Sequence, residues 1–173
     1  MTTRIMSDLH FNHAILMNIG KASRPTDYEK RLKHSLSTIK ASDTLVVLGD
    51  ICIGKDAEMH RRYIMPLKCR KVLVLGNHDG KSKARYNSHW RDETHDVLLV
   101  TDDLGLPENR WLYILGGRNI LLSHQPILEL PEGWYNIHWH YHDRQIKPIS
   151  EFHKLYSPEI ENYKPRRIES FIN

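Results

Sequence analysis

The fold is constrained most by two short apolar runs. Each run is followed by a glycine and then by a residue with a polar side chain. Residues 44–48 lead into Gly49-Asp50, and residues 71–75 lead into Gly76-Asn77. Such Val- and Leu-rich runs are typical of strands that are buried on both faces of a sheet. A capping box at residues 26–29 predicts a helix through about residue 39, and residues 56–65 predict another that ends before Pro66. Helices that alternate with buried strands indicate an α/β layered domain.

The second half of the chain is dominated by predicted strands. We expect strands at residues 96–100, 111–115, 119–122 and 135–138, in addition to a first strand at residues 3–6. The last of these is predicted to be the final strand, and a short helix is predicted at residues 166–172. A length of 173 residues fits one domain, so residues 1–173 are expected to form a single α/β unit with mixed sheets.

Polar side chains follow nearly every predicted strand. In open α/β sheets the ligand crevice lies outside the carboxyl ends of the strands, so we expect these side chains to gather at one edge. The two glycines fit this position, because they let the backbone turn sharply beside a crowded site. The side chains concerned are Asp8 and His10, then Asp50, then Asn77, His78 and Asp79, then His124, and finally His138, His140 and His142.

The types of side chain in this set favour a metal site. Carboxylate, imidazole and amide oxygen are ligands that suit Mn, Fe, Zn or Ni, and they do not indicate a soft thiolate site. The set is too large for one ion, whereas two ions that share one carboxylate would use it. A phosphate ester would then be held by both ions, and a bridging water that loses a proton would be the nucleophile. Cys52 and Cys69 are not a CxxC pair and do not indicate a disulfide framework.

Charge and hydropathy add a weaker constraint on partners and location. The formal net charge of +4 and the pI of about 9.0 lean toward an anionic substrate, although solvated Lys and Arg side chains are the commoner explanation. No apolar run is long enough to cross a bilayer, and residues 1–8 lack the apolar core of a signal peptide. We therefore expect a cytoplasmic protein with no membrane partner.

In its ordered blocks the sequence resembles the calcineurin-like metallophosphoesterases. That family has D-x-H, GD, GNH followed by an acid, a lone His after a strand, and GHxH. The corresponding blocks span residues 5–142 in family order, and residues 7–13 resemble the small phosphoesterases of bacteria and phages. They are Asp8-Leu9-His10, Gly49-Asp50, Gly76-Asn77-His78-Asp79, His124 and Trp139-His140-Tyr141-His142.

The resemblance implies an αββα sandwich of two mixed β-sheets flanked by helices, with a dinuclear metal centre. The enzyme would hydrolyse phosphomonoesters or phosphodiesters by attack of a metal-bridging hydroxide. Mn²⁺ is the expected ion, with Fe, Zn or Ni as alternatives. His78 would be a general acid or would stabilise the phosphoryl oxygens, with Asp79 orienting it. One ion would take Asp8, His10, Asp50 and His142, and the other would take Asp50, Asn77, His124 and His140.

One position departs from the family pattern. Trp139 stands where the family has glycine. Its ring is expected either to line the substrate pocket or to displace His140, and in the second case His138 would replace His140 as a ligand. His13 and Arg24 are further candidates for contact with the substrate phosphate, although each is equally well read as an ordinary surface residue.

Three functions stay open at this point. The first is hydrolysis of small phosphate esters, nucleotides among them. The second is a nuclease, which the basic balance permits although no nucleic-acid-binding module is visible. The third is a non-catalytic scaffold that retains the fold. A scaffold would be expected to lose ligands, and every ligand type of the family is present here, so an enzyme is favoured.

Overall fold

The computed structural model describes residues 1–17, 24–79, 97–99, 110–140 and 148–172. The first of two sheets has five strands in the order β4-β3-β2-β1-β9. Strands β1 to β4 are parallel, and β9 pairs antiparallel with β1. Their bounds are Thr3–Met6 for β1, Thr44–Leu48 for β2, Arg70–Val74 for β3, Val97–Leu99 for β4 and Arg166–Arg167 for β9.

Four strands form the second sheet, in the order β5-β6-β7-β8. Strands β5 and β6 make an antiparallel pair, whereas β6, β7 and β8 are parallel. The bounds are Arg110–Leu115 for β5, Arg118–Ser123 for β6, Tyr135–His138 for β7 and His153–Leu155 for β8. Both sheets are therefore mixed, as the sequence predicted.

The tail of the chain differs from the prediction. Strands β8 and β9 follow the strand that was expected to be last, and the helix expected at residues 166–172 is a short strand followed by the 3₁₀ turn η4 (Ile168–Phe171). These strands have three and two residues, and neither contains an apolar run. Their pairing with β7 and β1 decides their conformation, and local sequence carries no signal for it.

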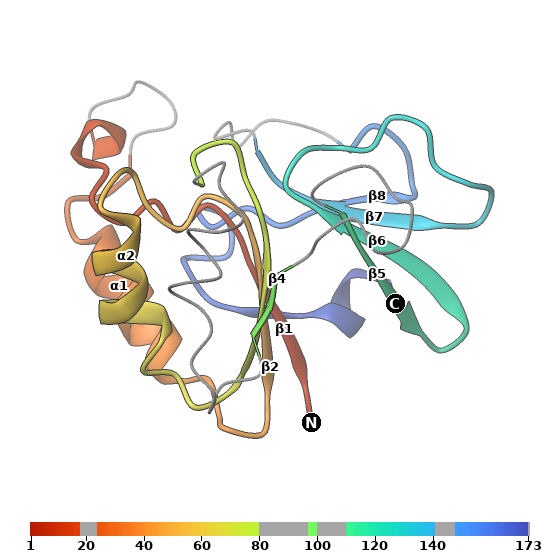
Figure 1. Ribbon diagram of the computed structural model, residues 1–173. Coiled ribbons are helices and arrows are strands. Elements are labelled where there is room, and N and C mark those ends of the chain that lie inside the picture. Colours follow the sequence, from red (N-terminus) through yellow and green to blue (C-terminus); the bar gives the residue numbers. More distant parts are fainter. Residues whose placement is uncertain (18–23, 80–96, 100–109, 141–147, 173) are drawn as a thin grey trace.

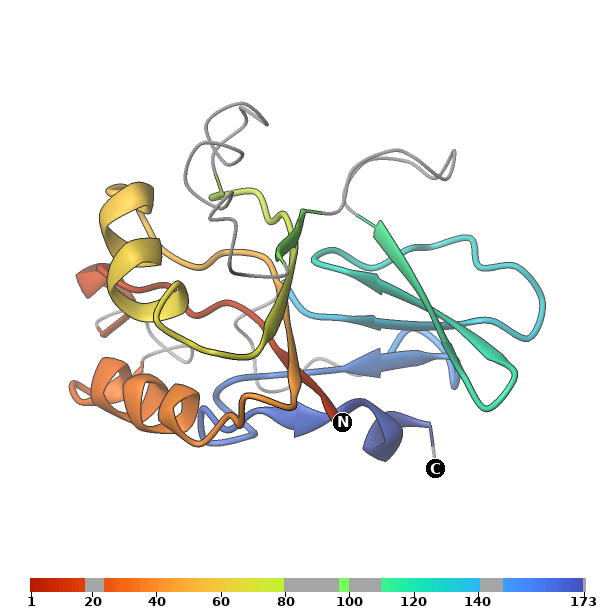
Figure 2. The same ribbon diagram turned by 60° about the horizontal axis from the view of Figure 1, so that its bottom comes forward.

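Helices cover one side of the first sheet, and the second sheet lies on its other side (Figures 1 and 2). Helix α1 (Tyr28–Ser37) and helix α2 (Asp56–Met59) supply this layer, and a π-helical turn, η3 (His60–Ile64), continues α2. Both sheets contribute to one core, with Ile5 and Val47 from the first sheet and Ile120 and Ile137 from the second. This architecture confirms the α/β sandwich. Of the helices in the described ranges, none has the length and apolar character to span a bilayer.

The capping box expected at the start of α1 is not formed. Asp27 occupies the cap position without a side-chain capping bond, and its carboxylate pairs instead with Arg31 at 3.0 Å. Glu29 accepts a hydrogen bond from the backbone N–H of Asn12 at 2.8 Å. The helix is held by its buried face, on which Tyr28 and Leu32 lie, as is usual for helices in proteins.

Candidate metal centre

Two chain segments continue side by side beyond the ends of β1 and β2. The N–H of Asp8 donates to the carbonyl of Gly49 at 3.1 Å, and that of His10 donates to the carbonyl of Asp50 at 2.9 Å. Asp8, His10 and Asp50 all have positive φ, at 51°, 49° and 55°. Residues other than glycine are uncommon there, and such strained positions concentrate at functional sites. Neighbouring strand ends thus deliver two carboxylates and an imidazole to one edge of the sheet.

Buried side chains hold this unusual backbone from behind. The Arg24 guanidinium donates to the carbonyls of Asp8 at 2.8 Å and Leu9 at 3.1 Å, and it pairs with Glu159 at 2.8 Å. Tyr28 donates its hydroxyl proton to the carbonyl of His10 at 2.8 Å. Arg24 is only 1 % exposed, so the expectation that it contacts substrate is wrong. Its role is to support the loop, which no local sequence signal indicated.

Asp50 lies at the centre of the cluster. It belongs to two groups of potential ligands whose atoms lie within 4.8 Å of one another, one with Asp8 and His10 and the other with His124 and His140. Its Oδ2 lies 3.6 Å from Nε2 of His10 and 3.4 Å from Nε2 of His124. One carboxylate oxygen therefore faces both groups, which is the arrangement that a shared carboxylate between two ions requires.

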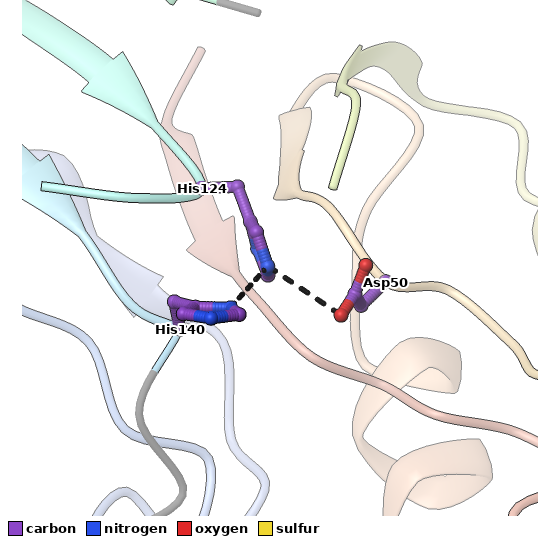
Figure 3. Close-up of side chains that lie close together, drawn as sticks. All are labelled: Asp50, His124 and His140. Atoms are coloured by element: carbon purple, nitrogen blue, oxygen red, sulfur yellow. Dashed lines mark hydrogen bonds and ion pairs between the residues drawn. The ribbon is translucent and has the colours of Figure 1, made fainter. Parts of the chain in front are cut away.

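The orientation of His124 leaves one ring nitrogen available to a ligand. Its Nδ1 lies 2.8 Å from the carbonyl oxygen of Leu48, which can only accept, so Nδ1 carries the proton. In the neutral ring Nε2 then presents its lone pair, 2.9 Å from Oδ1 of Asn77 and 2.9 Å from Nδ1 of His140. Figure 3 shows His124 and His140 from the second sheet meeting Asp50 from the first. A backbone acceptor that fixes the ring of a histidine is typical of metal sites.

Burial of the carboxylates also fits a bound cation. Asp8 is fully buried and Asp50 is 1 % exposed. Burial raises the pKa of Asp8 well above its usual value, which means that its charged form is disfavoured in the bare protein. Buried carboxylates are stabilised by pairing or by coordination of a metal. A donor set of carboxylates, imidazoles and one amide oxygen therefore suits divalent transition ions.

Asp79 has a different role from the one expected. Its carboxylate accepts hydrogen bonds from the N–H groups of Gly76 and Asp50, both at 2.7 Å, and of Ile51 at 3.1 Å. Burial raises the pKa of Asp79 to about 6. These contacts tie the loop after β3 to the loop after β2, so Asp79 positions the backbone of Asp50 rather than the ring of His78.

His78 and His13 lie at the rim of the cluster. The backbone N–H of His78 donates to Oδ1 of Asp50 at 2.9 Å, while the exposed ring lies 5.5 Å from that of His10. The ring of His13 is half-buried, 5.1 Å from that of His10 and 6.2 Å from that of His78. Both rings are therefore placed where a bound ester could reach them. His142 lies outside the described residues.

The register after β7 places His140 in the cluster. The backbone N–H of Trp139 donates to the carbonyl of His124 at 3.2 Å, which aligns the two loops. The indole of Trp139 is 1 % exposed, so the expectation that it lines the substrate pocket is wrong. His138 is equally buried, its ring lies 5.7 Å from that of His153, and burial lowers its pKa to about 4. The alternative in which His138 replaces His140 has no support in this geometry.

Gly49 and Gly76 allow the loops of the site to touch. A Cβ on Gly49 would lie 2.6 Å from Cα of Gly76 and 2.8 Å from Nδ1 of His124. A Cβ on Gly76 would lie 2.7 Å from the backbone nitrogen of Asp50 and would overlap its carboxylate. Separations this short are not tolerated between real atoms, so a side chain at either position must displace a candidate ligand.

Gly76→Ala is expected to weaken metal binding by roughly 10–100-fold, because displaced supporting groups have effects of that size on metal affinity. Titration against a chromogenic chelator would measure the affinity, and circular dichroism would establish that the variant is folded. Gly133→Ala is the control: its φ of 74° makes the added side chain strained in the backbone, but no atom lies within 4 Å of the added Cβ. Wild-type metal affinity in Gly76→Ala would show that this close packing does not matter for the site.

Comparison with known proteins agrees with this geometry. Over 91 residues, 50 % of the chain, the sequence is 34 % identical to the Gene 66 protein of Mycobacterium phage L5, and the match spans 44 % of that protein. A protein of unknown function from Aquifex aeolicus superposes with a TM-score of 0.69 at 23 % identity, covering 98 % of this chain and 96 % of that one. An archaeal phosphodiesterase superposes with a TM-score of 0.54 at 13 % identity, covering 97 % and 99 %.

The two solved structures share the fold at identities too low to carry a function. The family match is more informative, since the sequence model described as calcineurin-like phosphoesterase matches residues 1–169. Proteins of this family are metal-dependent, and the described residues contain Asp and His groups that could bind metal. Because the match extends over nearly the whole chain, this protein belongs to the calcineurin-like phosphoesterase family.

Proposed function

We propose that this phosphoesterase hydrolyses small phosphate esters at a dinuclear metal centre. The observation that carries the proposal is the position of Asp50, whose carboxylate belongs to both groups of candidate ligands. A single ion would not need a carboxylate shared in this way. Phosphomonoesters and phosphodiesters, including nucleotides, are both proposed as substrates, since the family is described as phosphoesterases without a narrower substrate class.

Each ion would be held by side chains from several strand ends. When bound, the ions would supply Lewis acidity toward the phosphoryl oxygens and lower the pKa of a coordinated water. Mn²⁺ is the proposed ion, with Fe, Zn or Ni as alternatives that the same donor set would accept. Asp8, His10, Asp50 and His142 would hold one ion, and Asp50, Asn77, His124 and His140 would hold the other.

The remaining residues would act on the substrate or on the ligands. The exposed ring of His78, beside His10, would hold a proton near the departing oxygen or stabilise the phosphoryl oxygens. The half-buried ring of His13 lies on the same side and would contact the phosphate. Arg24 and Asp79 would keep the ligand-bearing loops in place through the hydrogen bonds to Asp8 and Asp50.

Removal of metal is expected to lower hydrolysis of bis-p-nitrophenyl phosphate by at least about 10²-fold, because the ions provide most of the charge stabilisation. Activity should return on addition of excess metal, most completely with Mn²⁺. The rate before and after EDTA treatment, together with elemental analysis of the purified protein, would measure this. Full activity in excess chelator, with no metal in the protein, would rule out the two-ion proposal.

A further inference from the structure

A cavity of about 220 Å³ opens beside the second group of candidate ligands. The residues with polar groups that line it include Asn77, Arg110, Ser123, His124 and Gln125. Pairing of β5 with β6 places Arg110 directly opposite Ser123, one residue before His124. Arg110 therefore stands at the strand end that presents a candidate ligand.

Charge in this cavity is unbalanced. Arg110 is half-buried, and no aspartate or glutamate is among the described residues that line the cavity. In the part of the chain that the structure describes, the Arg110 guanidinium has neither an ion pair nor a hydrogen bond, whereas Arg4 and Arg24 each contact a carboxylate at 2.8 Å. The donors of such a guanidinium are available to a ligand, and its planar fork matches phosphate.

The neighbouring candidate metal ligands strengthen the case for an anion here. Asn77 and His124 line the cavity together with Arg110. A cation at those ligands and the guanidinium would repel each other unless a negative group lay near both. The exposed side chain of Gln125 lines the same cavity and offers further hydrogen bonds. The volume of the cavity is below the roughly 300–1,000 Å³ of pockets that enclose a whole ligand, so the cavity would hold one group of a substrate.

We propose that Arg110 binds a second phosphate group of the substrate and thereby selects phosphate esters that carry one. The proposal rests on the phosphoesterase function proposed above and narrows its substrate class. Arg110 would be a specificity-determining residue, since it recognises a part of the substrate that does not react.

Two chromogenic diesters that differ by one phosphate would test the proposal. Thymidine 5′-(p-nitrophenyl phosphate) and its 3′-phosphorylated form both release nitrophenolate. In the wild type kcat/KM should be about 10–100-fold higher for the 3′-phosphorylated form, the range expected for a contact made of charge-assisted hydrogen bonds. Arg110→Ala should bring this ratio close to one, and Arg110→Lys should restore part of it by keeping the charge without the fork. The control is Arg167→Ala, which removes an exposed arginine from β9 and should keep the wild-type ratio.

Calorimetric binding of the products gives a readout that does not depend on turnover. Thymidine 3′,5′-bisphosphate should bind the Mn²⁺-loaded wild type more tightly than thymidine 5′-monophosphate, and Arg110→Ala should remove this difference. Equal affinities in the wild type, or a difference that survives in Arg110→Ala, would overturn the proposal. Absence of hydrolysis of both diesters would instead count against the proposed function, and the binding comparison would still decide the role of Arg110.

Discussion

Asp50→Asn is expected to lower kcat/KM for phosphate esters by at least about 10³-fold, at the upper end of what removal of one electrostatic contact costs. The same substitution should reduce bound metal more than the loss of any ligand that serves one ion. The reason is the position of Asp50 in both groups of candidate ligands. In the proposed dinuclear centre its negative charge offsets the repulsion between two cations, and an amide carries no such charge.

Geometry makes the substitution more damaging than the loss of charge alone. Oδ1 of Asp50 accepts a hydrogen bond from the N–H of His78 at 2.9 Å, while Oδ2 faces the ring nitrogens of His10 and His124. An asparagine has one oxygen and one NH₂ group. If the NH₂ replaces Oδ1, two donors face each other, and if it replaces Oδ2, a donor points at the ion sites. Neither orientation reproduces the carboxylate.

The measurements are kcat/KM with Mn²⁺ in excess and the metal content after gel filtration. Asp43→Asn is a matched control, since Asp43 is also a buried aspartate, but it pairs with Arg4 at 2.8 Å away from the cluster. It should alter stability and keep both the metal content and the activity. His140→Ala provides the comparison with a ligand proposed for one ion. Asp50→Asn with the metal content and turnover of the wild type would contradict the shared role.

The candidate metal ligands that come directly after a strand could be predicted from the sequence. Parallel strands end at one edge of a sheet, so the positions of Asp8, Asp50, Asn77 and His124 after apolar runs were enough to place them together. The buried strands were also predictable, because a strand such as β2, buried along its whole length, is apolar at every position after Thr44.

The supporting contacts could not be predicted in this way. Arg24 reaches Asp8 and Leu9 from a separate part of the chain, and its burial depends on a partner, Glu159, that is 135 positions away. Asp79 follows His78 in sequence, yet its carboxylate turns toward the backbone of Asp50. Such contacts depend on the tertiary fold, and local spacing carries no record of them.

The environment of Trp139 likewise could not be predicted from the local sequence. A tryptophan beside ligand-bearing histidines suggested a wall of the substrate pocket, but successive residues of an extended chain point to opposite sides. His140 contacts His124 in the cluster, and the neighbouring indole of Trp139 is buried. The short strand β8 and the two-residue strand β9 were missed because residues distant in sequence pair with them.

His78→Ala is expected to reduce kcat/KM for esters with poor leaving groups by roughly 10²–10⁴-fold, the range of general acid catalysis. The physical reason lies in the leaving group. A ribose or alkyl alkoxide needs a proton as it departs, whereas nitrophenolate leaves readily without one. Loss of activity on p-nitrophenyl esters should therefore be much smaller. Metal content should stay unchanged, because the backbone N–H of His78, and not its ring, contacts Asp50.

The test compares one nucleotide or alkyl ester with one nitrophenyl ester, each measured on wild type and variant with metal saturating. His34→Ala is the control, since it removes an exposed histidine from α1. An equal loss on both substrates would show that the His78 ring stabilises the phosphoryl oxygens or positions the ester, because that effect does not depend on the leaving group. Loss of metal in the variant would refute both roles, since it would place the ring among the ligands. The position of His78 beside His10, exposed at the rim of the cluster, makes proton donation the expected result.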